Sequence, residues 1–234
     1  MKTPVRDYRK LRINNINSKE YSHLKLLLSW VVYFIMFFLT EKFIPEEACH
    51  IVHCRLDDLI PFNEFFIIFY ISWYFLIVGS LVYMLLYDIE GFKKMQTFII
   101  ITQIVAVVIY IVWPSVQYGR PVSFENSNLL TKLTALIYSV DTPTGVCPSL
   151  HVGYSIAIAS TWAKKRDISL YKRVLIIIWA TLICMSVAFV KQHSVVDILA
   201  AILMCIFAEF ILFGKSYWRP ILEKMVRRKD LINE

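Results

Sequence analysis

The chain has 234 residues, of which 58% are hydrophobic and 18% are charged, and its formal net charge is +7. The apolar residues are too many for an ordinary globular domain and come in long blocks, which predicts a membrane protein and excludes a soluble one. A positive charge could indicate a nucleic-acid partner, but the basic residues lie beside apolar runs, where anchors flanking a membrane are the simpler explanation. We therefore expect the bilayer as a partner and no nucleic acid.

Six apolar runs have the composition of transmembrane helices. The first follows a polar, basic segment, and because no small-residue cleavage site comes after it, we interpret it as a retained span and not as a signal peptide. We expect an all-α integral membrane protein, a six-transmembrane-helix bundle at 26–213 between a basic N-terminal segment at 1–25 and a basic tail at 214–234. The predicted spans are 26–40 (extending as far as 44), 65–87, 95–113, 150–163, 174–190 and 195–213. A short polar connection is predicted at 88–94, and a small helix at 129–138.

Lysine and arginine are distributed unevenly between the two ends of these spans. Of the 25, twenty lie in the N-terminal segment, the second-to-third connection, the fourth-to-fifth connection and the tail. The positive-inside rule then places both termini in the cytoplasm. The long loop at 115–148 would face the extracytoplasmic or lumenal side of a multi-pass protein, in the cell membrane of a bacterium or an endomembrane of a eukaryote.

The stretch 147–153 contains the first candidate catalytic residue. Ser149 is expected to be the N-cap of a helix, with His151 in its first turn. A helix N-terminus offers unpaired N–H groups and the positive end of a dipole, which suits phosphate. Ser149 is therefore a candidate phosphate ligand and His151 a candidate acid, with a capping or interfacial histidine as the alternative.

The second candidate pair is His193 and Asp197, four residues apart, which one helical turn would place on one face. A carboxylate at the centre of a span raises the free energy of membrane insertion by about 2.5–3.5 kcal/mol, so we expect Asp197 to have a stabilising partner or a functional role. His193 can donate a ring N–H to it, which fixes the tautomer and leaves the other nitrogen free to attack. A buried pair that only locks helices together is the alternative.

Cationic and acidic residues nearby complete the candidate set. Arg120 offers two-pronged donation to phosphate oxygens, with an interfacial arginine as the alternative. Lys191 is a further candidate phosphate ligand. Asp57 and Asp58 are interpreted as a solvated turn. Two histidines, one carboxylate and one arginine at one membrane face suggest a site for phosphoryl transfer.

The cysteines do not point to a metal centre. Cys49 and Cys54 frame the sequence Cys-His-Ile-Val-His-Cys, but the spacing of its histidines fits none of the common zinc sites well. Free thiols, or a local disulfide if the loop faces an oxidising compartment, are the expected states. We expect no metal and no cofactor.

Three stretches, in this order, resemble the motifs of the type 2 phosphatidic acid phosphatase superfamily. The resemblance implies a six-span, metal-independent enzyme that acts on lipid phosphates. It implies that His193 is the nucleophile that becomes phosphohistidine, that Asp197 orients it and that His151 protonates the leaving group. Arg120 and Ser149 would hold the phosphate. The stretches are Gly119-Arg120-Pro121, Pro148-Ser149-Leu150-His151 and His193-Ser194-Val195-Val196-Asp197.

Departures from these motifs point to one branch of the superfamily. Trp113 stands where the first motif has a lysine, Val187 where the third has an arginine, and Leu150 where the second commonly has a glycine. These changes resemble the branch with inositol phosphorylceramide and sphingomyelin synthases. Lys191 lies four residues beyond Val187, where one helical turn would give both a shared face, so we infer that it partly replaces the missing arginine. Two lost cations weaken the binding of a doubly charged monoester more than that of a singly charged diester.

The sequence therefore predicts a membrane lipid phosphate phosphatase with a membrane lipid phosphate as its substrate. The first alternative is a phosphotransferase that moves a phospho-headgroup to a lipid alcohol. A non-catalytic protein that binds or flips lipids and a small-ion transporter, with Asp197 as its coupling carboxylate, are the others. The intact set of His151, His193 and Asp197 argues against these last two.

Overall fold

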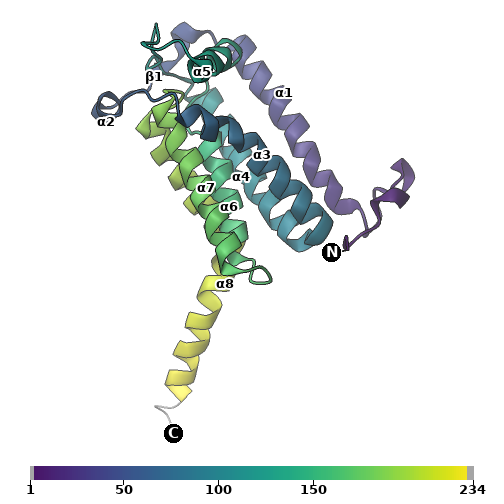
Figure 1. Cartoon of the computed structure of the whole chain (residues 1–234). Coiled ribbons are helices and arrows are strands. Elements are labelled where there is room, and N and C mark those ends of the chain that lie inside the picture. Colours follow the sequence, from purple (N-terminus) through teal and green to yellow (C-terminus); the bar gives the residue numbers. More distant parts are fainter. Residues whose placement is uncertain (1–2, 231–234) are drawn as a thin grey trace.

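The computed structural model describes residues 3–230, and the side chains of residues 3–214. Long helices dominate it, and irregular segments with two very short strands connect them at one end (Figure 1). The elements in chain order are η1 (Tyr8–Lys10), η2 (Ile13–Asn15), η3 (Ser22–Leu27), α1 (Leu28–Phe43), η4 (Glu46–Ala48), β1 (His50–Ile51), α2 (Arg55–Leu59), α3 (Phe66–Tyr87), α4 (Ile89–Val112), β2 (Ser115–Val116), α5 (Leu129–Val140), α6 (Leu150–Lys164), α7 (Leu170–Phe189) and α8 (Val195–Asp230), where η denotes a 3-10 helix.

Five helical segments of the described chain are long and apolar enough to cross a membrane: Ser22–Phe43, α3, α4, α7 and the Val195–Gly214 part of α8. Large apolar side chains cover the outside of these helices, as with Phe75, which is 70% exposed, and Leu203, which is 68% exposed. Surface of this kind is stable in hydrocarbon and not in water. The prediction of an all-α, multi-pass membrane protein is therefore confirmed.

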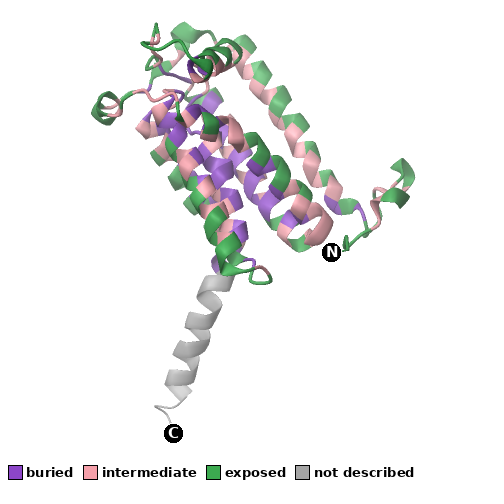
Figure 2. Ribbon diagram, viewed as in Figure 1, coloured by how far each residue is buried: buried purple, intermediate pink, exposed green. Residues whose placement is uncertain are grey.

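Helix α6 differs from the other long helices because it lies in the centre of the bundle. It has 15 residues and packs against α3, α4, α7 and α8. Most of its side chains are buried, in the region that Figure 2 colours purple. Gly153 allows close approach to α8, since a Cβ there would lie 3.1 Å from Cε of Met204. Small residues serve this purpose in membrane bundles.

Helix α1 leans away from the rest of the bundle in Figure 1, and its main helix partners are α4 and η3. Its far end is nevertheless anchored, because the Thr144 hydroxyl donates to Oε1 of Glu41 over 2.6 Å. The loop end of α1 therefore stays attached to the rest of the molecule.

The two ends of the bundle are built differently. At the loop end, β1 and β2 pair in parallel, with His50 opposite Ser115. At the other end, the N-terminal segment folds back on the bundle, where the Tyr8 hydroxyl donates to the Leu85 carbonyl over 2.9 Å. Figure 1 shows this segment at the end opposite α2, β1 and α5.

One predicted connection is in fact helical. The polar stretch 88–94 was expected to separate two spans, but α4 begins at Ile89 and only Asp88 lies between it and α3. Asp88 caps α4, because its side chain accepts from the Gly91 N–H over 2.9 Å. A capped helix start tolerates polar residues, so polarity alone did not mark a loop here.

Candidate functional site

The centre of the candidate site is the turn between α7 and α8. Helix α7 ends at Phe189, and the Val187 carbonyl accepts from the N–H groups of both Gln192 and His193, over 2.9 and 3.1 Å. Lys191 takes a φ of 52°, which reverses the chain direction. The inference that Lys191 shares a helical face with Val187 is therefore wrong, because the helix ends between them.

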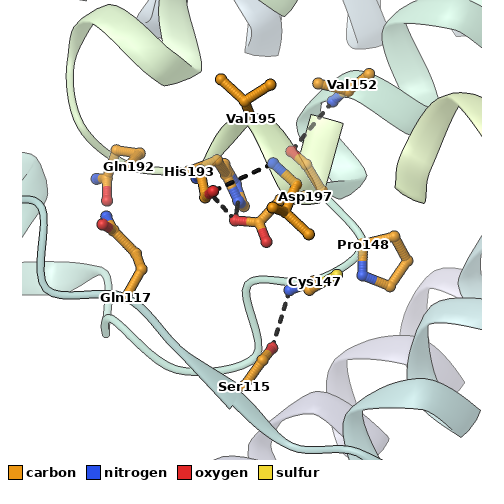
Figure 3. Close-up of polar contacts among 12 residues, drawn as sticks. Ser115, Gln117, Cys147, Pro148, Val152, Gln192, His193, Val195 and Asp197 are labelled. Atoms are coloured by element: carbon orange, nitrogen blue, oxygen red, sulfur yellow. Dashed lines mark hydrogen bonds and ion pairs between the residues drawn. The ribbon is translucent and has the colours of Figure 1, made fainter. Parts of the chain in front are cut away.

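The turn presents His193 to the first residues of α8 (Figure 3). Its Nδ1 lies 3.2 Å from Oδ2 of Asp197, and the Ser194 N–H donates to the same oxygen over 3.0 Å. Asp197 is completely buried. The predicted His–Asp contact is confirmed, although His193 lies just before the helix and not on it. Since Nδ1 faces the carboxylate, Nε2 is the nitrogen available for other chemistry.

His151 lies beside this pair, at the start of α6. The predicted N-cap is confirmed, because the Ser149 side chain accepts from the Val152 N–H over 3.5 Å. The Ser149 N–H donates to the Asp197 carbonyl over 3.2 Å, which joins the start of α6 to that of α8. The centroid of the His151 ring lies 5.6 Å from that of His193. Ser149 is completely buried, so its hydroxyl is used for capping.

Aromatic rings of α3 hold the His151 ring in place. Its centroid lies 4.6 Å from that of Tyr70 and 4.2 Å from that of Trp73. Nε2 of His151 is buried and has no hydrogen-bond partner among the described residues. The histidine therefore has a fixed position and an unused ring nitrogen.

Arg120 lies next to the turn, and its two terminal amino groups contact protein groups, while Nε has no partner among the described residues. Nη1 donates to the carbonyl of Asp141 over 2.8 Å, and Nη2 to the carbonyl of Thr142 over 3.1 Å. Nη2 also donates to Oε1 of Gln192 over 2.5 Å. The guanidinium lies over the Tyr138 ring, 4.8 Å from its centroid, and burial lowers the pKa of Arg120. Arg120 thus joins the C-terminal end of α5 to the turn.

Lys191 is also engaged by the protein. Its Nζ donates to the carbonyls of Asp57 and Ile60, over 2.7 and 2.5 Å. The two cations expected to bind phosphate therefore hold segments of the loop end together.

Asp57 caps α8 from a distant segment. Its carboxylate accepts from the Ser194 hydroxyl over 2.6 Å and from the Val195 N–H over 2.7 Å. The two aspartates lie in helix α2 and not in a turn. The predicted solvent exposure is confirmed for Asp58, which is exposed and pairs with His53 over 2.9 Å, and is wrong for Asp57. Burial raises the pKa of Asp57, but the hydrogen bonds to Ser194, Val195 and Cys54 outweigh it, so the net shift is downward.

Two further polar residues at the site have no signal in the sequence. Asp141, at the end of α5, accepts from the Tyr70 hydroxyl over 3.2 Å. Burial raises the pKa of Asp141, against the lowering effect of His193 and Arg120. Gln192 is almost completely buried beside His193. Neither belongs to a motif, and only the folded chain places them at the site.

An apolar cavity of about 500 Å³ leads away from the histidines between α1 and α3. His151, His193, Gln192 and Asp141 line one part of it, and the other lining residues are mostly apolar and aromatic, including a row along α1 from Trp30 to Phe37. No lysine or arginine of the described chain lines it. His193 also borders a second cavity of about 320 Å³, lined by loop residues that include Asp57, Gln117 and Lys191.

The cysteines are the remaining candidates. Cys49 and Cys54 are free thiols, and among the described side chains, those of residues 3–214, no group of three histidine, cysteine or acidic residues is arranged to hold a metal ion. Burial and the Asp197 carboxylate raise the pKa of Cys147, next to the site, to about 12, so this thiol stays protonated at neutral pH.

No protein family, curated protein or solved structure matches this chain. The assignment of a function therefore depends on the geometry of the site and on the three motifs.

The Asp57 cap gives a test of how the turn is held. Asp57→Ala should lower the free energy of unfolding by about 0.5–2 kcal/mol, as the loss of a helix cap does. Because folding lowers the pKa of Asp57, its stabilisation is complete above the unfolded value of about 3.9 and is lost as the pH falls through the folded value. Thermal unfolding of the purified protein should show a difference from wild type at pH 7 that shrinks near pH 3.

Asp58→Ala is the matched control, because Asp58 is exposed and pairs only with His53 in the described structure. Equal thermal stability of the Asp57 and Asp58 variants at pH 7 would contradict a capping role for Asp57.

Proposed function

We propose that this protein is a membrane lipid phosphate phosphatase that works through a phosphohistidine at His193. The observation that carries the proposal is a histidine held through Nδ1 by a buried carboxylate, 5.6 Å from a second histidine, at the polar part of an apolar cavity. Such a cavity suits an acyl chain, and the histidine pair suits the phosphate attached to it.

In the first step, the lone pair on Nε2 of His193 attacks phosphorus. The bond between phosphorus and the lipid oxygen breaks, and its electrons remain on that oxygen. His151, in its protonated form, gives this oxygen a proton, so the lipid leaves as a neutral alcohol. Asp197 stabilises the positive charge that the His193 ring acquires and keeps its tautomer fixed.

In the second step, water attacks phosphorus and the P–N bond breaks, with its electrons returning to Nε2. His151 takes a proton from the attacking water and is ready for the next cycle. The first turn of α6 supplies N–H groups that have no intrahelical partner, at Leu150 and His151, which line the cavity. They are suitable donors for phosphoryl oxygens.

Transfer to a lipid alcohol is the second candidate, and one observation favours it. The cavity carries the Asp141 carboxylate and no lysine or arginine of the described chain, while Arg120 and Lys191 contact carbonyl and amide groups. Such a lining suits a singly charged phosphodiester better than a doubly charged monoester. A diester would leave its headgroup phosphate on His193, for transfer to a second lipid.

The proposal includes the topology. Helix α6 would be the sixth span, and its 15 residues suffice because it lies inside the bundle, where no lipid has to be matched. The distribution of lysine and arginine supports cytoplasmic termini and an extracytoplasmic or lumenal active site. The membrane would be the cell membrane of a bacterium or an endomembrane of a eukaryote.

The covalent intermediate is the direct test of the mechanism. With a lipid labelled in its phosphate, His193→Ala should abolish trapping of label on the protein, because the nucleophile is gone. His151→Ala should slow turnover by about 10²–10⁴-fold, most for poor leaving groups. His50→Ala, which removes an exposed histidine stacked on Trp113, is the control and should retain activity. Full activity of the His193 variant, or complete inhibition by a chelator, would exclude this mechanism.

The acceptor is tested by product analysis. Wild-type protein is given a phospholipid labelled in its headgroup phosphate, with and without ceramide or diacylglycerol. The phosphatase proposal expects a water-soluble labelled product whichever lipid alcohol is present, because water reaches the intermediate; this product is free phosphate from a monoester and the headgroup phosphate from a diester. Label on the added alcohol, with no water-soluble labelled product, would show transfer in place of hydrolysis.

The topology is tested with tags. Tags at the two termini should be reachable only from the cytoplasm, and a tag beside Ser127 only from the other side, since 20 of 25 basic residues flank one end of the spans. A terminus that reacts from outside intact cells would refute this placement.

A further inference from the structure

Gln192 has one amide atom in use and one without a partner. The residue lies directly before His193 in the turn (Figure 3). It lines the cavity between α1 and α3 and is 2% exposed. Its Oε1 accepts from Nη2 of Arg120 over 2.5 Å. Its Nε2 is buried and has no hydrogen-bond partner among the described residues.

Arg120 fixes which end of the amide faces which way. A guanidinium can only donate, so the group it contacts must be the amide oxygen, and the nitrogen must point elsewhere. A buried amide N–H without an acceptor destabilises a folded protein, and such groups call for an explanation. An acceptor that arrives with a ligand would provide one.

The candidate acceptor is the phosphoryl group that His193 attacks. Gln192 and His193 are adjacent in the chain and line the same cavity. The terminal amino groups of Arg120 and Nζ of Lys191 cannot replace the amide without giving up contacts, because the former donate to three carbonyls and to Gln192, and the latter to two carbonyls. Nε of Arg120 has no partner among the described residues, but Arg120 does not line the cavity, whereas Gln192 does.

We propose that Nε2 of Gln192 donates a hydrogen bond to a phosphoryl oxygen of the substrate, and that Arg120 is the positioning residue that aims it. The site would thus hold an anion with a neutral donor where an arginine or lysine would be the usual choice. That the anion is a lipid phosphate rests on the proposed function. The hydrogen bond itself does not depend on turnover.

The experiment measures binding of inorganic phosphate to purified full-length protein, from the rise in thermal unfolding temperature with phosphate concentration. Gln192→Leu should weaken binding by about tenfold or more, as expected for a lost hydrogen bond to a charged group. Gln192→Glu keeps the size of the side chain and its acceptor for Arg120, and replaces the donor by an oxygen. It should abolish measurable binding while the protein stays folded.

Gln103→Leu is the matched control. Gln103 is also a buried glutamine, and it does not line the cavity. Its substitution should leave phosphate binding unchanged.

The role of Arg120 is separated from direct binding by a double-mutant cycle. If Arg120 acts through Gln192, Arg120→Lys weakens phosphate binding in the wild type and has little further effect in the Gln192→Leu background. Additive losses would show that Arg120 contacts phosphate itself and would overturn its positioning role.

Wild-type affinity in the Gln192→Leu variant, or no phosphate binding by the wild type, would overturn the inference. If the Gln192→Leu variant binds phosphate with wild-type affinity and label is still trapped at His193, the inference is wrong but the proposed function stands. Binding of phosphate that depends on Gln192, without any trapping by the wild type, would refute the proposed function alone.

Discussion

The buried carboxylate of Asp197 is the constraint on which the loop end of this molecule depends. A negative charge with no access to solvent needs donors, and it receives them from Nδ1 of His193 and the Ser194 N–H. Both donors come from the turn before α8, so the turn must fold over the helix start. The backbone carbonyl of Asp197 also accepts from the Ser149 N–H, and this hydrogen bond holds the first turn of α6, which contains His151, beside the start of α8. One residue thus joins two helix starts and gives one histidine its orientation.

The turn between α7 and α8 also requires other segments of the chain to stabilise it. The helix ends gathered around it leave carbonyl and N–H groups without intrahelical partners, and charged side chains of the loop end satisfy them. Asp57 caps α8, Lys191 holds the backbone around α2, and Arg120 binds the end of α5. Charged side chains are effective here because each can serve several backbone groups at once. Their use in holding the loops together leaves the cavity with histidine, an amide and one carboxylate.

The helices and the convergence of the motif residues could be predicted from local signals. Apolar runs locate the helices, the Pro-Ser start locates the N-cap of α6, and a four-residue spacing predicts the contact between His193 and Asp197. The remainder depends on contacts between distant segments. Asp57 and Ser194 are 137 positions apart in the sequence, and no pattern in either segment indicates that they are in contact. The predicted face shared by Lys191 and Val187 is wrong because it requires a helix through both positions, whereas α7 ends at Phe189. Gln192 has no role that its neighbours in the sequence could reveal.

The position of His193 between two cavities has a consequence for the direction of the proposed reaction. One cavity is apolar and follows α1, and the other is lined by polar loop residues such as Asp57, Gln117 and Lys191. An amphiphile cleaved at this boundary yields a hydrophobic product and a hydrophilic one, each beside an environment that dissolves it. Dilution of the two products into separate phases lowers the chance that they meet again at the histidine. The architecture would therefore favour net cleavage through physical separation of the products, without any need for the site to bind one of them weakly.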